Sequence, residues 1–213
     1  MASTVEICNL ALSNLGDSAT VASIDPPEGS AQAEHCARYF PQALASIQED
    51  HDWSFCLRRG ALTAVTNPTS TWQYAYAAPS GMIRPVAVLS PTATDDYSMA
   101  STNGIGGLYA PQPYAMETDS NGNRIILTNQ ADAVLRYTVG VTDTTKFSPM
   151  FVEALVCLLE SKLAGPVIKG DAGRKASKAA LQTYAYWLAK AKGSDGSNRD
   201  VKPQQDVTWL SAR

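Results

Sequence analysis

The side chains best suited to proton transfer lie together near position 50. His51 is flanked by Glu49, Asp50 and Asp52, and a histidine beside carboxylates can act as a general acid or base. The same four residues follow a segment with helical periodicity, where a charged cluster simply ends the helix. We therefore interpret them as a helix terminus, and we expect no catalytic residue here.

A second candidate for chemistry is the segment 15–18. Its order Leu-Gly-Asp-Ser resembles the nucleophile motif of the GDSL-type esterases. In that family the motif follows a buried parallel strand, and a catalytic Asp-x-x-His lies near the C-terminus. Here an amphipathic helix precedes the motif and no histidine occurs beyond His51, so a serine hydrolase of this type is not expected.

Metal, cofactor and phosphate sites have equally weak signals. Zinc sites need spaced ligand pairs, whereas no two cysteines form C-x-x-C, and Cys8, Cys36 and Cys157 fall among apolar helical positions as expected for buried thiols. The glycine-rich segment 104–107 lacks the flanking strand, helix and Lys-Ser/Thr of a phosphate loop. No carboxylate pair stands out as a glycosidase dyad. The sequence predicts no cofactor, no metal and no enzyme activity.

Charge and hydropathy limit the partners. The net charge of −3 argues against a dedicated nucleic-acid binder. Residues 169–192 nevertheless carry six cations against Asp171 alone; a solvated helix face is the simpler interpretation, and contact with an acidic partner or nucleic acid is the alternative. No signal peptide and no apolar run of about 20 residues is present, so we expect no membrane partner and synthesis in a cytosol.

Helical patterns occupy both ends of the chain. Ser3 and Glu6 form a capping box for a first helix that ends at Gly16. A second helix is expected over about 30–49, with Pro41 kinking or interrupting it. Ser148-Pro149 predicts the start of a third helix, closed by Gly165-Pro166, and a fourth begins at Asp171.

Strand patterns occupy the middle of the chain. Strands are expected at 72–76, 83–89 and 133–139, and segments 114–117 and 124–127 flank a hairpin turn. Residues 90–113 form a long polar excursion. The fold class expected is α+β but mainly α: an antiparallel helical bundle of residues 1–60 and 145–192, a small inserted antiparallel β part at 61–144, and an extended tail at 193–213.

Aromatic residues mark both sides of the first boundary between these parts. Trp53 and Phe55 end the helical segment, and Trp72, Tyr74 and Tyr76 follow at every second position. Such alternation predicts that the last three share one face of a strand. We interpret the five residues as a structural joint that holds the β part against the helices.

An ordered series of residues resembles the tail tubular protein A family, the head-to-tail adaptors of short-tailed bacteriophages. The resemblance covers most of residues 3–165 and is strongest up to Pro79. Its motifs are Glu6-x-x-Asn9-x-Ala11-Leu12-x-x-Leu15-Gly16, Ile24-Asp25 with a proline turn, Ala33-x-x-Cys36-x-x-Tyr39-Phe40-Pro41, Trp53-x-Phe55 with Arg58 and Arg59, Trp72-x-Tyr74-x-Tyr76-x-x-Pro79, and more loosely Tyr137 and Thr145-x-Phe147-Ser148-Pro149-x-Phe151.

The resemblance implies a structural virion protein made in the host bacterial cytoplasm. Twelve copies would form a ring between the portal protein and a nozzle or tail tube, with tail fibres left open as a further partner. DNA would pass through the lumen without specific binding. Two alternatives remain: a tail-associated peptidoglycan hydrolase, reported for some related adaptors, and an oligomeric scaffold unrelated to phages.

Candidate interface residues follow from this resemblance and from side-chain type, because aromatics near a chain end are frequent hot spots. The portal-contact candidates are Lys175, Lys178, Tyr184, Trp187, Trp209 and Leu210. The candidates for contact with the distal tail component are Ser120, Asn121, Gly122 and Asn123, at the hairpin tip.

Overall fold

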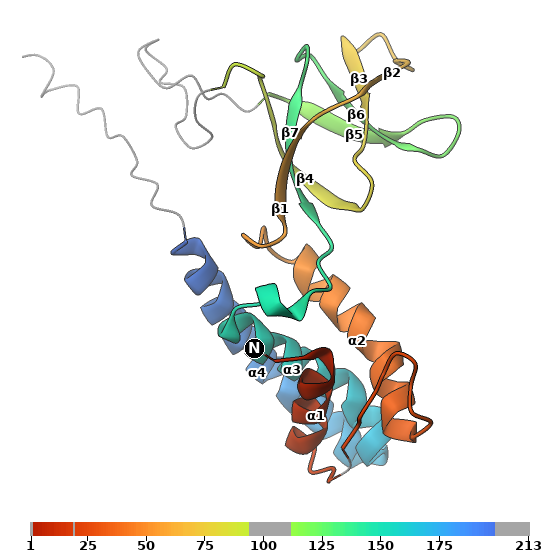
Figure 1. The fold of residues 1–213 in the computed structure, drawn as a ribbon, viewed down its shortest axis with the longest axis vertical. Helices are drawn as coiled ribbons and strands as arrows, with labels where there is room; N and C mark the ends of the chain where they lie inside the picture. Colours follow the sequence, from red (N-terminus) through yellow and green to blue (C-terminus); the bar gives the residue numbers. More distant parts are fainter. Residues whose placement is uncertain (1, 19, 94–111, 199–213) are drawn as a thin grey trace, which may run out of the picture. The chain divides into compact units, whose positions relative to one another are not determined.

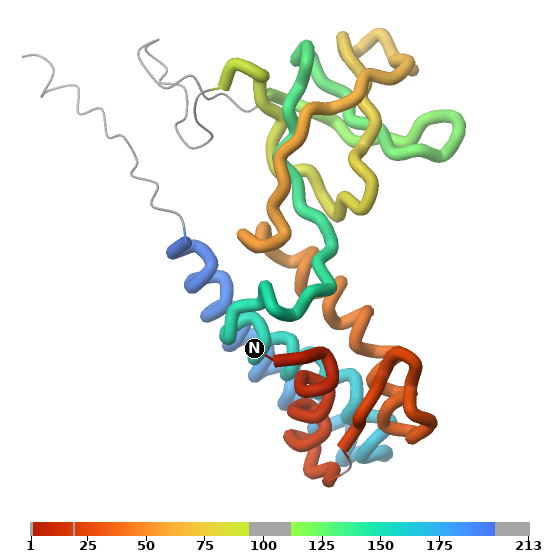
Figure 2. Tube along the Cα trace, in the orientation of Figure 1, coloured from red at the N-terminus to blue at the C-terminus, as the bar shows by residue number. Residues whose placement is uncertain are grey.

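The chain folds into two compact units, each with its own core. The computed structural model describes residues 2–18, 20–93 and 112–198 (Figure 1). The helical unit comprises Met1–Cys56 and Gly140–Asn198, and the β unit contains Leu57–Val139. Figure 2 follows the trace as it leaves the helical unit after α2 and returns to it before α3. The β unit is therefore an insertion in the sequence of the helical unit.

The expected fold class, a helical bundle with a small β insertion, is wrong. Over the described residues the fold is α+β, with four α-helices, one short 3-10 helix and seven strands in two antiparallel sheets. The first two strands, β1 (Leu57–Ala61) and β2 (Ala64–Val65), were missed because they are largely exposed and lack apolar alternation. Segment 57–60, assigned in advance to the helices, thus begins the β unit.

The apolar helix α3 is the centre of the helical unit. It spans Pro149–Ile168, is buried at most positions from Phe151 to Ala164, and packs against all three other helices. These are α1 (Thr4–Asn14), α2 (Ala31–Glu49) and α4 (Gly170–Gly196); the 3-10 helix η1 (Thr144–Lys146) precedes α3. None of the helices in the described ranges is both long and apolar enough to cross a membrane.

Local signals placed the helix starts correctly. The capping box predicted at Ser3 and Glu6 is confirmed, with both reciprocal hydrogen bonds present. Ser148 caps α3 through the backbone N–H of Phe151, and Pro149 occupies the first helical position as predicted. In each case the determining residues lie within four positions of one another, so no tertiary contact is needed to select the start.

Two predicted helix boundaries, the end of α3 and the start of the tail after α4, are wrong, and Pro41 does not interrupt α2. Helix α2 is continuous through Pro41, which is exposed, so water can reach the carbonyl group that a proline leaves unpaired. Helix α3 includes Pro166 and ends at Ile168, where Lys169 and Gly170 both adopt positive φ and reverse the chain. Helix α4 then runs to Gly196, so residues 193–196 belong to the helix rather than to the expected tail.

Two antiparallel sheets build the β unit. One has the strand order β1-β7-β4, and the other has β2-β3-β6-β5. The remaining strands are β3 (Tyr74–Ala77), β4 (Met82–Leu89), β5 (Tyr114–Thr118), β6 (Arg124–Thr128) and β7 (Val134–Val139). The predicted β5–β6 hairpin is confirmed, with Glu117 opposite Ile125. Buried side chains from both sheets form one core: Tyr76, Met82, Val88, Ile126, Ala133 and Leu135.

Of the three alternating aromatics predicted to share one face, Tyr74 and Tyr76 do so, with ring centroids 6.4 Å apart, but Trp72 does not. Trp72 precedes β3 and packs with Ala75 and Leu127 on one side of its sheet, whereas Tyr76 lies in the core on the other side. The Tyr76 hydroxyl donates to the carbonyl oxygen of Gln130 at 2.8 Å. The periodicity failed at Trp72 because the extended backbone of the strand begins only at Tyr74.

Trp53 and Phe55 belong to the core of the helical unit. Their rings lie 4.9 and 5.0 Å from the ring of Phe151, both edge to face. The ring of Phe147 lies 5.3 Å from that of Phe55. Two of these four aromatics lie in the segment after α2, and the other two lie just before α3 and in its first turn. They therefore pack together where the chain leaves the helical unit and where it re-enters it. Their role in a joint to the β unit stays a prediction.

Candidate functional site

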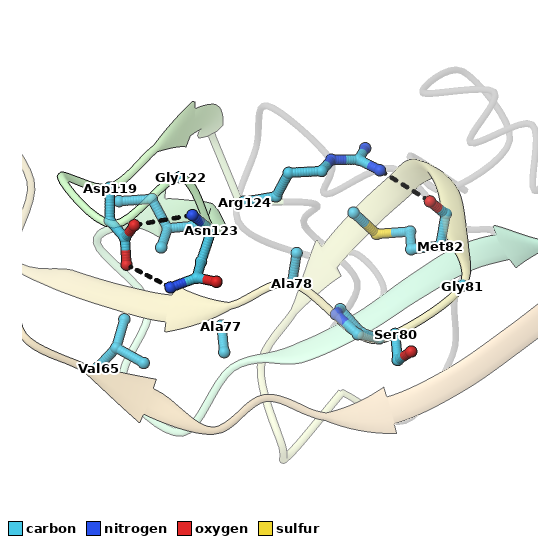
Figure 3. Close-up of a pocket in the computed structure, with 12 residues that line it drawn as sticks. Val65, Ala77, Ala78, Ser80, Gly81, Met82, Asp119, Gly122, Asn123 and Arg124 are labelled. Atoms are coloured by element: carbon cyan, nitrogen blue, oxygen red, sulfur yellow. Dashed lines mark hydrogen bonds between the residues drawn. The ribbon is translucent and has the colours of Figure 1, made fainter.

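A pocket beside the β5–β6 hairpin is the candidate binding site of the β unit (Figure 3). Its volume is about 500 Å³, and it lies between the hairpin loop and the turn that joins β3 to β4. Its lining residues are Val65, Ala77, Ala78, Pro79, Ser80, Gly81, Met82, Asp119, Gly122, Asn123, Arg124 and Ile125.

Asp119 fixes the shape of the hairpin loop. One carboxylate oxygen accepts hydrogen bonds from the backbone N–H groups of Asn121 and Asn123, both at 2.8 Å. The other accepts from the Asn123 side-chain amide at 3.1 Å (Figure 3). Hydrogen bonds from the backbone and side chain of Asn123 lower the pKa of Asp119. The loop is thus held in one conformation by its first residue, and Gly122 supplies the positive φ of 84° that the turn requires.

Arg124 connects the two sides of the pocket. Its guanidinium donates to the carbonyl oxygens of Met82 at 2.9 Å and Ile83 at 3.2 Å, and Figure 3 shows the side chain reaching across to Met82. The backbone carbonyl of Arg124 accepts from the N–H of Ala78 at 3.0 Å. A partner would therefore meet a preformed surface with little conformational entropy left to lose.

Half of the predicted distal contact lies in this pocket. Gly122 and Asn123 line it, while Ser120 and Asn121 are exposed at the hairpin tip. Sequence reasoning identified the tip but missed Asp119 and Arg124 as the residues that shape it. An aspartate at the first position of a turn is a recognisable signal for the former. The contact made by Arg124 depends on where the fold places β4, and no residue near Arg124 in the sequence indicates that position.

The predicted portal contacts on α4 divide into two groups. Lys175 and Lys178 are exposed, whereas Tyr184 and Trp187 are half-buried. The helix packs mainly against α3 within the helical unit. Burial, together with the charge of Asp50, raises the pKa of Tyr184 to about 12. Trp209 and Leu210 lie outside the described residues.

The exposed aromatic of α4 is one that sequence reasoning missed. Tyr186 is 56% exposed, its ring lies 5.4 Å from that of Trp187, and the Lys190 ammonium lies 5.3 Å from its centroid. Leu181 is exposed on the same helix. Both residues fall outside the apolar stripe read from the sequence, and that departure from periodicity is the signal that could have identified them.

His51 packs into a polar cluster at the end of the helical unit. Its Nε2 lies 3.4 Å from the carboxylate of Asp195, which also accepts from the Ser54 hydroxyl at 2.6 Å and from the Ser54 backbone N–H at 3.1 Å. Lys192 pairs with Asp50 at 2.8 Å. In a Ser-His-Asp triad the serine hydroxyl donates to histidine; here it donates to the carboxylate, so the cluster fastens α4 to the segment after α2.

The cysteines are buried free thiols, as predicted for Cys8, Cys36 and Cys157. Burial raises the pKa of Cys157 to about 11, with a further contribution from Glu160. Within the described residues, no cluster of three histidine, cysteine or acidic side chains could hold a metal ion.

No family model matches this chain, and a comparison with curated proteins found no similar one.

Proposed function

We propose that this chain is a head-to-tail adaptor of a tailed bacteriophage. Copies of it form a ring between the portal protein and the distal tail, a nozzle or tube, and the ring conducts DNA. The helical unit contacts the portal through the exposed face of α4, and the β unit contacts the distal component through the pocket beside the β5–β6 hairpin. The protein resides in the virion.

The observation that carries this proposal is the division of the chain into two separately cored units, one inserted in the other. A protein that bridges two partners needs a distinct surface for each. Here one unit presents Lys175, Lys178 and Tyr186 on a long helix, and the other presents a rigid, pocketed hairpin. Tyrosine is enriched where the binding energy of an interface concentrates, and the two lysines would steer an acidic partner toward this helix.

The residues that resemble the adaptor family also have definite structural tasks. The side chain of Asn9 donates to the carbonyl of Val21 at 2.9 Å and accepts from the N–H of Val21 at 2.8 Å. This pair fixes the segment after α1 to the outside of that helix. Gly16 ends α1 with a φ of 77°, and Cys36 and Phe40 are buried along α2. The resemblance therefore extends to residues that determine the fold of the helical unit.

The decisive experiment measures assembly on the portal. The chain is mixed with the portal ring encoded in the same genome, and the complex is sized by sedimentation velocity and imaged by electron microscopy. We expect a ring of this protein to add to the portal, and the double variant Lys175→Glu/Lys178→Glu to weaken the association at least tenfold. Arg38→Glu, an exposed charge reversal on α2, is the matched control.

Two outcomes would overturn the proposal. If the wild-type chain does not bind an intact portal ring, the adaptor function is wrong. If the chain does not bind the portal but forms oligomers by itself, the scaffold alternative is favoured instead.

One observation favours the hydrolase alternative enough to include it in the test. Burial raises the pKa of Glu160 on α3, and its carboxylate accepts from the Asn14 side chain at 3.2 Å. A raised carboxyl pKa is typical of a general acid in glycoside hydrolysis. Lysis of peptidoglycan by the purified chain that Glu160→Gln abolishes would favour this function.

A further inference from the structure

Two of the buried cysteines meet in the core of the helical unit. Cys8 lies on the buried side of α1, and Cys36 lies on the buried side of α2. Their side chains are hydrogen-bonded to each other, and neither has any exposed surface. Both are free thiols. Two thiols in contact can be joined as a disulfide, a reaction that needs a second sulfur within reach of the first.

The residues around the two sulfurs show that α1 and α2 lie side by side here. A groove of about 640 Å³ is lined by Val5 of α1 and by Ala37 and Phe40 of α2, among other residues. Val5 lies three positions before Cys8 and therefore on the same side of α1, and Cys36 directly precedes Ala37. The contact between the sulfurs thus belongs to a packed pair of helices.

The hydrogen bond gives the two sulfurs different reactivities. The thiol of Cys8 donates, and this bond together with burial raises the pKa of Cys8. The same bond lowers the pKa of Cys36, because the accepting sulfur is stabilised as a thiolate. The thiolate is the nucleophilic form of cysteine. Cys36 is therefore the sulfur that reacts first, and Cys8 is the one that follows.

We propose that Cys8 and Cys36 form an oxidation site at which a peroxide converts the two thiols into a disulfide. The Cys36 thiolate attacks one peroxide oxygen, the O–O bond breaks, and hydroxide leaves as Cys36 becomes a sulfenic acid. The Cys8 sulfur then attacks the Cys36 sulfur, the S–O bond breaks, and hydroxide leaves with the proton of Cys8 as water. The first hydroxide takes the proton that Cys36 had lost. The two thiols lose two electrons, and one peroxide is reduced to two molecules of water.

Burial makes this reaction depend on movement of α1. Peroxide reaches sulfurs without exposed surface only in molecules in which the helix has opened locally. The disulfide then ties α1 to α2 and closes the loop of residues 8–36, so the helix no longer opens freely. The site is therefore a redox-controlled lock on the first helix of the chain.

The inference does not rest on the adaptor proposal, because it concerns the chain by itself. The redox state of the surroundings selects the state of the lock, since a cytosol keeps thiols reduced and disulfides persist outside it. In a protein that is made in a cytosol and released in a virion, the disulfide would form after release.

The test treats the folded 213-residue chain with hydrogen peroxide, labels the remaining thiols with N-ethylmaleimide in an acidic denaturant, and maps the peptides by mass spectrometry. Trypsin leaves both cysteines in peptide 1–38, because Arg38 is the first lysine or arginine of the sequence. We expect this peptide to lose the mass of two hydrogen atoms and to take up no label, while Cys157 is labelled. Cleavage after Glu28 should leave two peptides that dithiothreitol separates.

The melting temperature of the helices, followed by circular dichroism, gives a second readout. Oxidation should raise it by about 5–10 °C, because a disulfide that closes a loop of this length restricts the unfolded chain. Dithiothreitol should reverse the rise. Cys36→Ala should show neither the loss of mass nor the rise, whereas Cys157→Ala, the matched control at another buried thiol, should show both.

Three results would contradict the inference: two labelled thiols in peptide 1–38 after peroxide treatment, a sulfinic acid at Cys36 without a disulfide, or a disulfide that joins two copies of the chain. Treatment in concentrated urea is the control for the fold. An equal yield of the same disulfide in urea would show that the packing of α1 and α2 does not direct it. The peptide map of the wild-type chain decides the question even if a substitution prevents folding.

Discussion

Trp53 has no exposed surface, and its indole N–H donates to the carbonyl oxygen of Ile47 at 2.7 Å. Trp53→Ala removes a large buried ring and leaves that C-terminal carbonyl of α2 without its donor. We expect a loss of about 3–5 kcal/mol in the free energy of unfolding, measured by urea denaturation. Tyr74→Ala is the control: its side chain is 38% exposed, so a loss below about 1 kcal/mol is expected.

An equal loss in the two variants would contradict this difference in burial. It would mean that the tyrosine ring contributes as much packing as the fully buried indole.

Gln48 holds the returning chain against α2. It is 2% exposed, and its side-chain amide donates to the carbonyl of Val141 at 2.6 Å and accepts from the N–H of Val141 at 3.1 Å. Gln48→Ala leaves two buried backbone groups unpaired, so we expect a loss of about 2–4 kcal/mol in unfolding free energy. Gln42→Ala, at an exposed position of the same helix, should change it by less than about 0.5 kcal/mol. Similar values for both variants would contradict the assigned role.

The stability of the β unit should depend on the ionisation of Asp119. Its pKa is lower in the folded state than in the unfolded chain, so its contribution to stability is complete above the ordinary aspartate pKa of about 4. That contribution is lost as the pH falls through the lowered folded-state pKa. Wild type should therefore exceed Asp119→Asn in stability at neutral pH, and the difference should shrink in acid, measured by denaturation between about pH 2 and pH 6. A constant difference would contradict the prediction.

At the scale of elements, two glycines of α4 should respond in opposite directions to the same change. A Cβ on Gly173 would lie 2.8 Å from the carbonyl oxygen of Ala164 on α3, whereas a Cβ on Gly193 would meet no atom within 4 Å. We expect Gly173→Ala to destabilise by about 1–3 kcal/mol despite its better helix propensity, and Gly193→Ala to stabilise by about 0.5–1 kcal/mol. Thermal unfolding followed by circular dichroism measures both.

Stabilisation by Gly173→Ala would show that α3 and α4 can separate at their junction without cost. The contrast between the two sites therefore tests the close approach of these helices, and not helix propensity alone.

At the scale of the whole molecule, a substitution on the exposed face of α4 should affect assembly but not stability. Tyr186 contacts Trp187 and Lys190 but remains 56% exposed. Tyr186→Ala should alter the unfolding free energy by less than about 0.5 kcal/mol, yet weaken association with the portal ring if the proposed function holds. Sedimentation with and without the portal, beside urea denaturation, distinguishes the two effects. A large loss of stability would instead assign the ring to the core.

The sequence located the helices and the β5–β6 hairpin well and the β unit poorly. Helix caps and hairpin turns are encoded within a few residues, as at Ser148 and in the 119–123 loop. Strands β1 and β2 are short and exposed, so they gain their structure from pairing with β7 and β3 rather than from their own residues. Their absence from the sequence analysis made the β part appear small.

The candidate surface residues also divide into those that local sequence signals identify and those that only the tertiary structure reveals. The hairpin tip and the lysines of α4 could be found from residue type and periodicity. Arg124 could not, because its partners at Met82 and Ile83 lie 42 and 41 residues away. Tyr186 was passed over because the periodic stripe selects the buried side of a helix, whereas a partner meets the other side.

The sequence by itself determined where α1, α3 and the β5–β6 hairpin begin, because caps and turns are satisfied by neighbours along the chain. It also predicted buried thiols. Only the tertiary structure brought Ser54 to Asp195, 141 residues apart, and placed Arg59 opposite Arg136. Such pairs depend on strand register and helix packing, which are selected by the burial of the whole core and not by the residues that meet there.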